Sequence, residues 1–364
     1  MTVAGCGIFN QSGPTPSPTK SPIGASPTVS IPAATPTATP IPTPQLVKSI
    51  TLVAPVGEPK DWTPAGLTWL GIEATAARIG ATSKLVQPAS NSEYTGAVDQ
   101  AAQADGALVV TVGPVAVASV QAVAAAHPAT QFLEMGVVAP DTSPPNVHGL
   151  VFDEAEAGYL AGYVAASFAT SGKVGMVGDT ATDTATGNYS AGLRSGANQA
   201  APATVVTVVY GGSPDLPDRG RTAAAGLVKA GDSVIVAMPS LTGIGALRQA
   251  CSNKARIVAV DTDAWQTVPD IRPCLVVSVM KRYDAAVTSA ITAIANGRTL
   301  AAVTLNDVAN GGIALSEFHA DLPTGFQGGL DALMATLRNG PPRPTPAQPT
   351  PPPAASSSPK PPAK

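Results

Sequence analysis

Charged residues are scarce in this sequence, and no basic cluster occurs. Lysine, arginine, aspartate and glutamate together make up 12% of the 364 residues, and the formal net charge is −3. Nucleic-acid binding needs a concentrated positive patch, so this class of function is excluded. The chain has only three cysteines and three scattered histidines, so we expect no bound metal ion.

The sequence also lacks an apolar run of about 18 or more residues, the length that a transmembrane helix needs. Membrane attachment would therefore require another device. Residues 2–6 read Thr-Val-Ala-Gly-Cys, which resembles the lipobox at which bacterial lipoproteins are cleaved and lipidated on cysteine. We expect Cys6 to be a lipid anchor that holds the protein on the extracytoplasmic face of the cell membrane. The alternative is a chance run of small residues before a cysteine.

Proline is plentiful but confined largely to the two ends of the chain. Of 37 prolines, ten lie in residues 11–45 and eleven in residues 340–364. These segments hold few large apolar residues, so burial cannot offset a backbone ordering cost of roughly 1–2 kcal/mol per residue. We expect 1–45 to be a disordered tether and 340–364 a disordered tail, which leaves 46–339 to fold.

Strand-like and helix-like segments alternate through the first half of this region. Apolar, β-rich runs at 49–54, 84–87 and 107–112 are each followed by an alanine-rich helical stretch, at 67–80, 94–104 and 115–127. The continuous apolar run at 107–112 is typical of a strand covered on both faces. The pattern therefore predicts a parallel sheet with crossover helices.

The same alternation repeats in the second half. Strand-like runs at 173–177, 204–210 and 233–237 are followed by helical stretches at 190–199, 219–229 and 243–251, and further strands are expected at 256–260 and 275–279. We predict two doubly wound lobes joined by a hinge: lobe 1 from 46–152, completed by about 281–300, and lobe 2 from 153–280, completed by about 301–320. Ligands bind beyond the carboxyl ends of strands in such sheets, so residues that follow strands are the informative ones.

Several polar or aromatic residues occupy those strand ends. They are Asp61, Trp62, Gly113, Asp153, Glu154, Asp261, Asp263 and Lys281. Carboxylates suit the hydroxyl and amine donors of a ligand, and Trp62 or Trp265 offers a flat apolar face for a ring. This set favours a sugar or heterocycle, although an aspartate at a strand end can equally cap the next helix.

Catalytic and cofactor signals are weak. The Asp261 and Asp263 pair could serve in acid–base chemistry, but no nucleophile elbow, zinc signature or phosphate loop accompanies it. Gly243 and Gly245 could open a helix toward an anion, yet the full spacing of a dinucleotide-binding or Walker motif is missing. We expect no catalysis and no cofactor.

Cys251 and Cys274 form an even pair once Cys6 is assigned to lipid. An oxidising compartment would favour a disulfide between them. Two buried thiols that pack as small hydrophobic groups are the alternative.

The order of segments resembles the basic membrane protein family of lipoproteins, which includes a purine nucleoside receptor. The most specific matches are 152–162 (FDEAEAGYLAG), 173–178 (KVGMVG) and 278–284 (SVMKRYD), supported by 192–197 (GLRSGA) and Val-Asp-Thr-Asp at 260–263. The resemblance implies a type 1 periplasmic-binding fold, an ATP-driven importer with its permease as partner, and a bound nucleoside.

The resemblance also implies roles for particular residues. Trp62 stands at the position of the family's stacking Phe, with Asp61 just before it. Asp261 and Asp263 match the acids that read the ribose, and Lys281 matches the family's lysine. Three positions depart from the pattern: Thr63 replaces an Asn, Trp265 follows Ala264 where Gln is usual, and Pro214 stands where a second aromatic residue is often found.

The leading hypothesis is therefore a monomeric, lipid-anchored binding protein that delivers a nucleoside-like compound to an ABC permease. Its expected ligand-binding residues are Asp61, Trp62, Thr63, Gly113, Asp261, Asp263, Trp265 and Lys281. A ligand-sensing lipoprotein of the same fold, a hydrolase acting on nucleosides and a structural cell-envelope protein are the alternatives.

Overall fold

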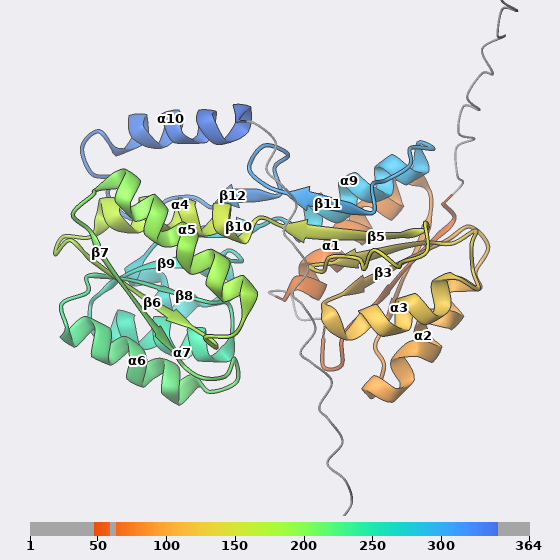
Figure 1. The fold of residues 1–364 in the computed structure, drawn as a ribbon, viewed down its shortest axis with the longest axis horizontal. Helices are drawn as coiled ribbons and strands as arrows, with labels where there is room; N and C mark the ends of the chain where they lie inside the picture. The colour runs from red at the N-terminus through yellow and green to blue at the C-terminus, as the bar shows by residue number, and fades with distance from the viewer. Residues whose placement is uncertain (1–46, 59–62, 341–364) are drawn as a thin grey trace, which may run out of the picture. The chain divides into compact units, whose positions relative to one another are not determined.

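The first lobe is built on a six-stranded sheet whose four inner strands are short and largely buried (Figure 1). The computed structural model describes residues 47–58 and 63–340. In spatial order the strands are β11 (Val303–Asn306), β5 (Val147–Phe152), β4 (Gln131–Met135), β3 (Ala107–Val112), β1 (Ser49–Val53) and β2 (Thr82–Val86). Every pairing is parallel. All carboxyl ends of these strands therefore meet at one edge.

Helices cover both faces of this sheet. On one face, α1 (Pro64–Ile79) and α9 (Tyr283–Ala295) pack against residues such as Leu52 and Leu133. On the other, α2 (Tyr94–Ala102) and α3 (Val117–Ala124) enclose Val53 and Val109. Single turns η1 (Asn91–Glu93) and η2 (Pro114–Ala116) precede α2 and α3. Helices on both faces explain why β3 is buried along its whole length and apolar at every position except Thr111.

The second lobe repeats the plan. Its strands, in spatial order, are β12 (Ile313–Leu315), β10 (Leu275–Lys281), β9 (Arg256–Asp261), β8 (Val234–Ala237), β6 (Lys173–Gly178) and β7 (Val205–Tyr210). One face carries α4 (Glu154–Phe168), α5 (Thr184–Ala200) and α10 (Phe326–Asn339), and the other carries α6 (Pro217–Lys229) and α7 (Leu241–Ser252). The short α8 (Ala264–Thr267) and η3 (Pro269–Cys274) link β9 to β10.

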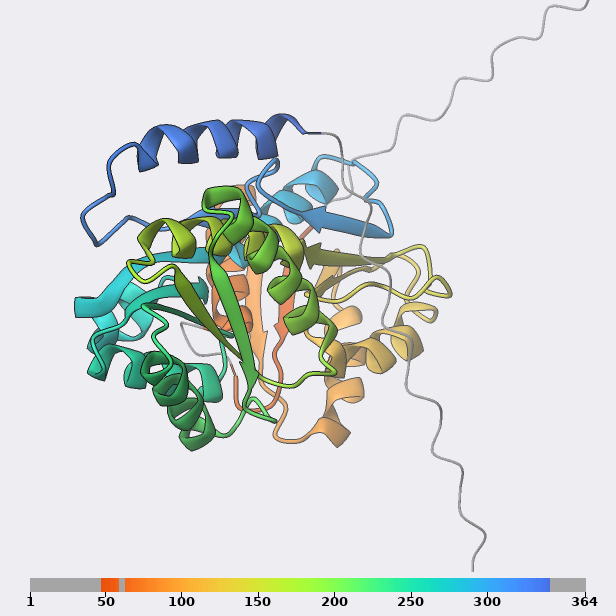
Figure 2. The ribbon, with the colours of Figure 1, turned by 60° about the vertical axis from the view of Figure 1, so that its left-hand side comes forward.

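Glycines bring α4 and α5 into backbone contact. A Cβ at Gly158 or Gly162 of α4 would collide with the backbone of α5, and a Cβ at Gly192 or Gly196 of α5 would collide with α4. This close approach places the first two turns of α4 beside Tyr189 and Gly192 of α5. The helix α10, in dark blue, runs above α4 and α5 (Figure 2). The Phe326 ring at the start of α10 lies 5.2 Å from the Phe168 ring at the end of α4.

The predicted fold class is confirmed: two parallel-sheet α/β lobes, connected where β5 leads into α4, β10 into α9 and β11 into β12. Two details differ from expectation. β12 pairs antiparallel with β10. The range 301–320, assigned from sequence to lobe 2, divides between the lobes, because β11 pairs with β5 of the first sheet and β12 lies in the second. The expected tether at 1–45 and the tail residues 341–364 lie outside the described residues.

Candidate functional site

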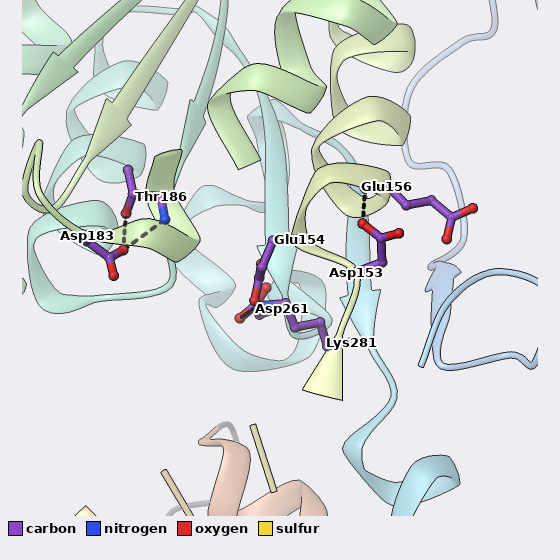
Figure 3. A network of polar contacts seen from close by, with 7 residues as sticks. All are labelled: Asp153, Glu154, Glu156, Asp183, Thr186, Asp261 and Lys281. Atoms are coloured by element: carbon purple, nitrogen blue, oxygen red, sulfur yellow. Dashed lines mark hydrogen bonds and ion pairs between the residues drawn. The ribbon is translucent and has the colours of Figure 1, made fainter. Parts of the chain in front are cut away.

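A buried lysine joins two carboxylates at the carboxyl edge of the second sheet. Lys281 is the last residue of β10, Asp261 the last residue of β9, and Glu154 the first residue of α4. The Lys281 Nζ atom lies 2.6 Å from Glu154 Oε1 and 3.0 Å from Asp261 Oδ2 (Figure 3). Three elements distant in sequence thus converge on one ammonium group.

Little solvent reaches this network. The side chains of Lys281, Asp261 and Glu154 are 5%, 8% and 19% exposed. Burial raises the pKa of Glu154 to about 7; Lys281 opposes this rise, and Asp261 adds to it. Burial lowers the pKa of Lys281, but the carboxylates of Asp261 and Glu154 outweigh it and raise that pKa well above its usual value. The lysine is therefore charged.

Three polar atoms of this network and its surroundings find no hydrogen-bond partner among the described residues. They are Asp261 Oδ1, Glu154 Oε2 and the hydroxyl of Tyr189. Tyr189 is fully buried on α5, and burial, followed by the Asp261 charge, raises the pKa of its hydroxyl. Asp261 also holds a left-handed backbone conformation, φ +67°, which is unusual for a non-glycine residue. Unpaired polar atoms and strain of this kind concentrate at functional sites.

Other acidic residues at this edge cap helices. Asp153 Oδ1 accepts from the Glu156 amide at 2.9 Å, and Asp183 Oδ2 accepts from the Thr186 amide at 2.8 Å, so they cap α4 and α5 (Figure 3). Asp263 Oδ1 accepts from the Trp265 amide at 3.1 Å at the start of α8. For Asp263, the structure shows the capping alternative, and its expected ligand role stays a prediction.

A largely apolar pocket adjoins the network. Asp261 and Thr262 line the pocket, and so does Tyr283, whose ring lies 4.5 Å from that of Phe152. Its remaining lining residues are Pro64, Ala237, Met238, Pro239, Ile244, Leu247, Ala259, Val260, Ala264, Thr267 and Val268. A carboxylate beside an apolar wall suits a ligand with hydroxyl donors at one end and an apolar ring at the other.

Thr63 and Gly113, two further predicted site residues, make local contacts. Thr63 caps α1, accepting from the Gly66 amide at 3.1 Å. Gly113 follows β3 with φ +77°, and its amide donates to the Met135 carbonyl oxygen at 2.9 Å. Asp61, Trp62 and Cys6 lie outside the described residues.

Trp265 is held away from the Lys281 network. Its ring stacks on His319 at a centroid distance of 3.9 Å, and the Arg272 guanidinium lies over it at 5.1 Å. Trp265 does not contribute to the pocket beside Asp261, as far as the described residues define that pocket. The expected contact of this ring with a ligand stays a prediction.

Cys251 and Cys274 form a disulfide, with Cα atoms 5.4 Å apart. The bond ties the last turn of α7 to the end of η3 at the start of β10. This is the end of the second sheet opposite to Lys281, so the disulfide supports the lobe rather than the site.

Sequence reasoning placed Glu154 at a strand end but did not include it among the expected site residues, and it missed Tyr189 and Tyr283. The available signal for Glu154 was its place directly after the capping Asp153, at the helix start that follows β5. For Tyr189 the sequence holds no comparable signal, because its position beside Asp261 depends on the close packing of α4 and α5.

Comparison with known families identifies this architecture. The model of the family described as "ABC transporter substrate-binding protein PnrA-like" matches residues 66–322. The chain belongs to this family. The predicted family is confirmed, and PnrA-like proteins bind substrates for ABC transporters rather than catalyse reactions.

Curated relatives agree with this placement in the PnrA-like family. The ABC transporter nucleoside-binding protein BmpA of Lactococcus lactis is 28% identical over 49% of this chain and 52% of its own length. Basic membrane protein A2 of Borrelia garinii is 30% identical over 35% of this chain and 38% of its own length. The chain thus spans about half or less of the length of these relatives.

Solved structures share the fold. A solute-binding protein of an ABC transporter system from Aeropyrum pernix superposes with a TM-score of 0.62 at 22% identity, covering 80% of this chain and 82% of the other. One from Conexibacter woesei gives a TM-score of 0.62 at 24% identity, covering 80% and 96%. None of the described helices is both long and apolar enough to cross a membrane.

Proposed function

We propose that this PnrA-like protein is the extracytoplasmic binding component of an ABC importer and that it captures a nucleoside-like compound at the Lys281 network. It delivers this ligand to a permease as a monomer anchored through lipid on Cys6. The family placement supports the importer role, and the name of the Lactococcus lactis relative supports the nucleoside.

The observation that carries the proposal is the set of unpaired oxygens around Lys281. Asp261 Oδ1 and Glu154 Oε2 can each accept a hydrogen bond from a ligand hydroxyl, while Lys281 keeps both carboxylates oriented. The apolar pocket beside Asp261 can receive the remainder of a ring compound. A hydroxyl-rich ligand would then satisfy groups that otherwise carry a desolvation cost of about 1–3 kcal/mol each.

Thermal unfolding of the full chain against a panel of nucleosides, bases, sugars and amino acids tests the ligand class. A compound present at about 100 times its Kd adds about 2.7 kcal/mol to stability. We expect a shift with nucleosides alone. A shift in unfolding temperature with another class of compound would change the assigned ligand class and leave the proposed binding role standing.

The substitution Asp261→Asn tests the site. Asparagine tolerates the left-handed backbone conformation and keeps the side-chain shape, so the fold should survive. We expect nucleoside binding to weaken by about 1–3 kcal/mol, because one charged acceptor is lost. The exposed Asp321→Asn at the other end of the same lobe is the matched control. Equal affinity in the two variants would show that the ligand binds elsewhere.

A further inference from the structure

Three helix N-termini at the carboxyl edge of the second sheet, those of α4, α5 and α7, are already capped by side chains of the protein. The N-terminus of α6 has no side-chain cap but carries Asp218 in its first turn. Helix N-termini in α/β sheets are the usual place where a phosphate group binds, because free amides and the helix dipole favour an anion. Here Asp153 caps α4 and Asp183 caps α5. Ser240 caps α7 and donates from its hydroxyl to Asp179 Oδ1 at 2.5 Å.

These carboxylates interact with one another and with the ligand-facing network. Burial raises the pKa of Asp179, and the charges of Asp183 and Asp215 raise it further. Asp183 likewise adds to the raised pKa of Glu154. The cations at this edge include Lys281, which is shared between Glu154 and Asp261, Arg282, which is paired with Asp284, and Arg219, which lies close to Gly212. The edge therefore carries an excess of negative charge.

This acidic edge is also the part of the lobe where ligand-directed atoms remain unpaired. Asp261 lines the apolar pocket, and its Oδ1 atom finds no partner among the described residues. The Tyr189 hydroxyl, fully buried beside the same network, is also without one there. The third unpaired atom is Glu154 Oε2. All three atoms can accept a hydrogen bond from a neutral donor, and none carries a positive charge that would attract a phosphate.

We propose that this edge excludes phosphorylated ligands and that Glu154 is a specificity-determining residue that restricts the site to uncharged or cationic compounds. The proposal rests on the proposed function, since it concerns which nucleoside-like compounds the site accepts. A phosphate brought to this edge would find no free helix terminus on α4, α5 or α7. It would also face like charges in a poorly hydrated site, where repulsion is least screened.

Calorimetric titration of the full chain with adenosine, guanosine and their 5′-monophosphates tests this exclusion. We expect the unmodified protein to bind the better nucleoside at least about tenfold more tightly than its monophosphate, a factor that corresponds to about 1.4 kcal/mol. Glu154→Gln should narrow this ratio severalfold, because it removes a charge and keeps a hydrogen-bonding side chain of the same shape. Asp321→Asn, an equal change of charge in the same lobe, should leave the ratio unchanged.

A second variant keeps the exclusion testable if Glu154→Gln does not fold. Asp183→Asn also removes one negative charge, and asparagine caps a helix about as well as aspartate. It should narrow the ratio in the same direction, by a smaller factor.

The outcomes separate the two proposals. Equal binding of nucleoside and monophosphate, or a ratio that neither variant changes, would overturn the exclusion and leave the nucleoside-binding function standing. Failure of both nucleosides to bind would overturn the proposed function, and the exclusion would fall with it.

Discussion

Glu134 in the first lobe and Glu154 in the second both lie near the carboxyl end of their sheet, and their carboxyl groups have different partners. Glu134 lies on β4 of the first lobe, fully buried, and neither carboxyl oxygen has a partner among the described residues. Glu154, in the second lobe, is bonded to Lys281. Burial raises the pKa of each to about 7. Burial is the largest cause of the raised pKa in both carboxyls, but only Glu154 shares a cation with a second carboxylate.

The surroundings explain the difference. Glu134 stands opposite Thr111 in the β3–β4 register, and the Thr111 hydroxyl is also unpartnered among the described residues. Two polar groups inside the apolar core of the first lobe therefore add cost without forming a network. In the second lobe, Lys281 offsets much of the cost for Glu154 and Asp261, and leaves one oxygen of each for a ligand.

Removing the shared cation should have the largest effect. Lys281→Met leaves Glu154 and Asp261 buried side by side without a counter-charge, as Glu134 is. Breaking a buried ion pair by removing one partner costs about 3–5 kcal/mol, and we expect the free energy of unfolding to fall by that amount. Urea denaturation at neutral pH measures it.

Lys229→Met, an exposed position at the end of α6, is the control and should change stability by less than about 0.5 kcal/mol. If Lys281→Met were as stable as this control, the network would contribute nothing to the fold, and the contrast with Glu134 would disappear.

Removing the unpaired charge from the first lobe should stabilise the protein. The folded-state pKa of Glu134 lies above its ordinary value of 4.5, at about 7. Between these values the folded state retains a proton that the unfolded state releases, so stability is lost as the pH rises and remains lost above the folded pKa. Glu134→Gln abolishes this loss, and we expect a gain of about 3 kcal/mol at about pH 8 relative to about pH 4.

Denaturation of Glu134→Gln and the parent across this pH range measures the difference. Glu73→Gln, exposed on α1 of the same lobe, provides the matched control and should follow the parent at every pH. A constant offset between Glu134→Gln and the parent would mean that the pKa of Glu134 is the same in the folded and unfolded states.

The sequence predicts the strands well because their apolar runs are continuous, and it predicts Asp261 and Lys281 because both directly follow such runs. The sequence does not predict to which sheet a short strand belongs. β11 and β12 are only four and three residues long, and pairing with strands far away in the chain decides their lobe.

Sequence also does not show which of two neighbouring acidic residues at the start of a helix belongs to the site. Asp153 and Glu154 are adjacent acidic residues that the sequence does not distinguish. Their side chains point in different directions: Asp153 accepts from the Glu156 amide, and Glu154 binds Lys281, 127 positions away. The stacking of Trp265 on His319 likewise depends on a segment beyond β12 that no local pattern connects to Trp265. Local patterns find the edge of the sheet; long-range packing decides which side chains share it.

The smallest expected effect concerns two buried tyrosines, one beside each glutamate. In the first lobe the Tyr94 hydroxyl donates to the Val53 carbonyl oxygen at 2.6 Å, whereas the Tyr189 hydroxyl has no partner among the described residues. Tyr94→Phe should cost about 1 kcal/mol, the net worth of a typical hydrogen bond, and Tyr189→Phe should cost nothing or stabilise slightly. Urea denaturation of the two variants measures both. Equal losses would show that the Tyr189 hydroxyl is bonded in solution, and the second lobe would then have one fewer atom available for a ligand.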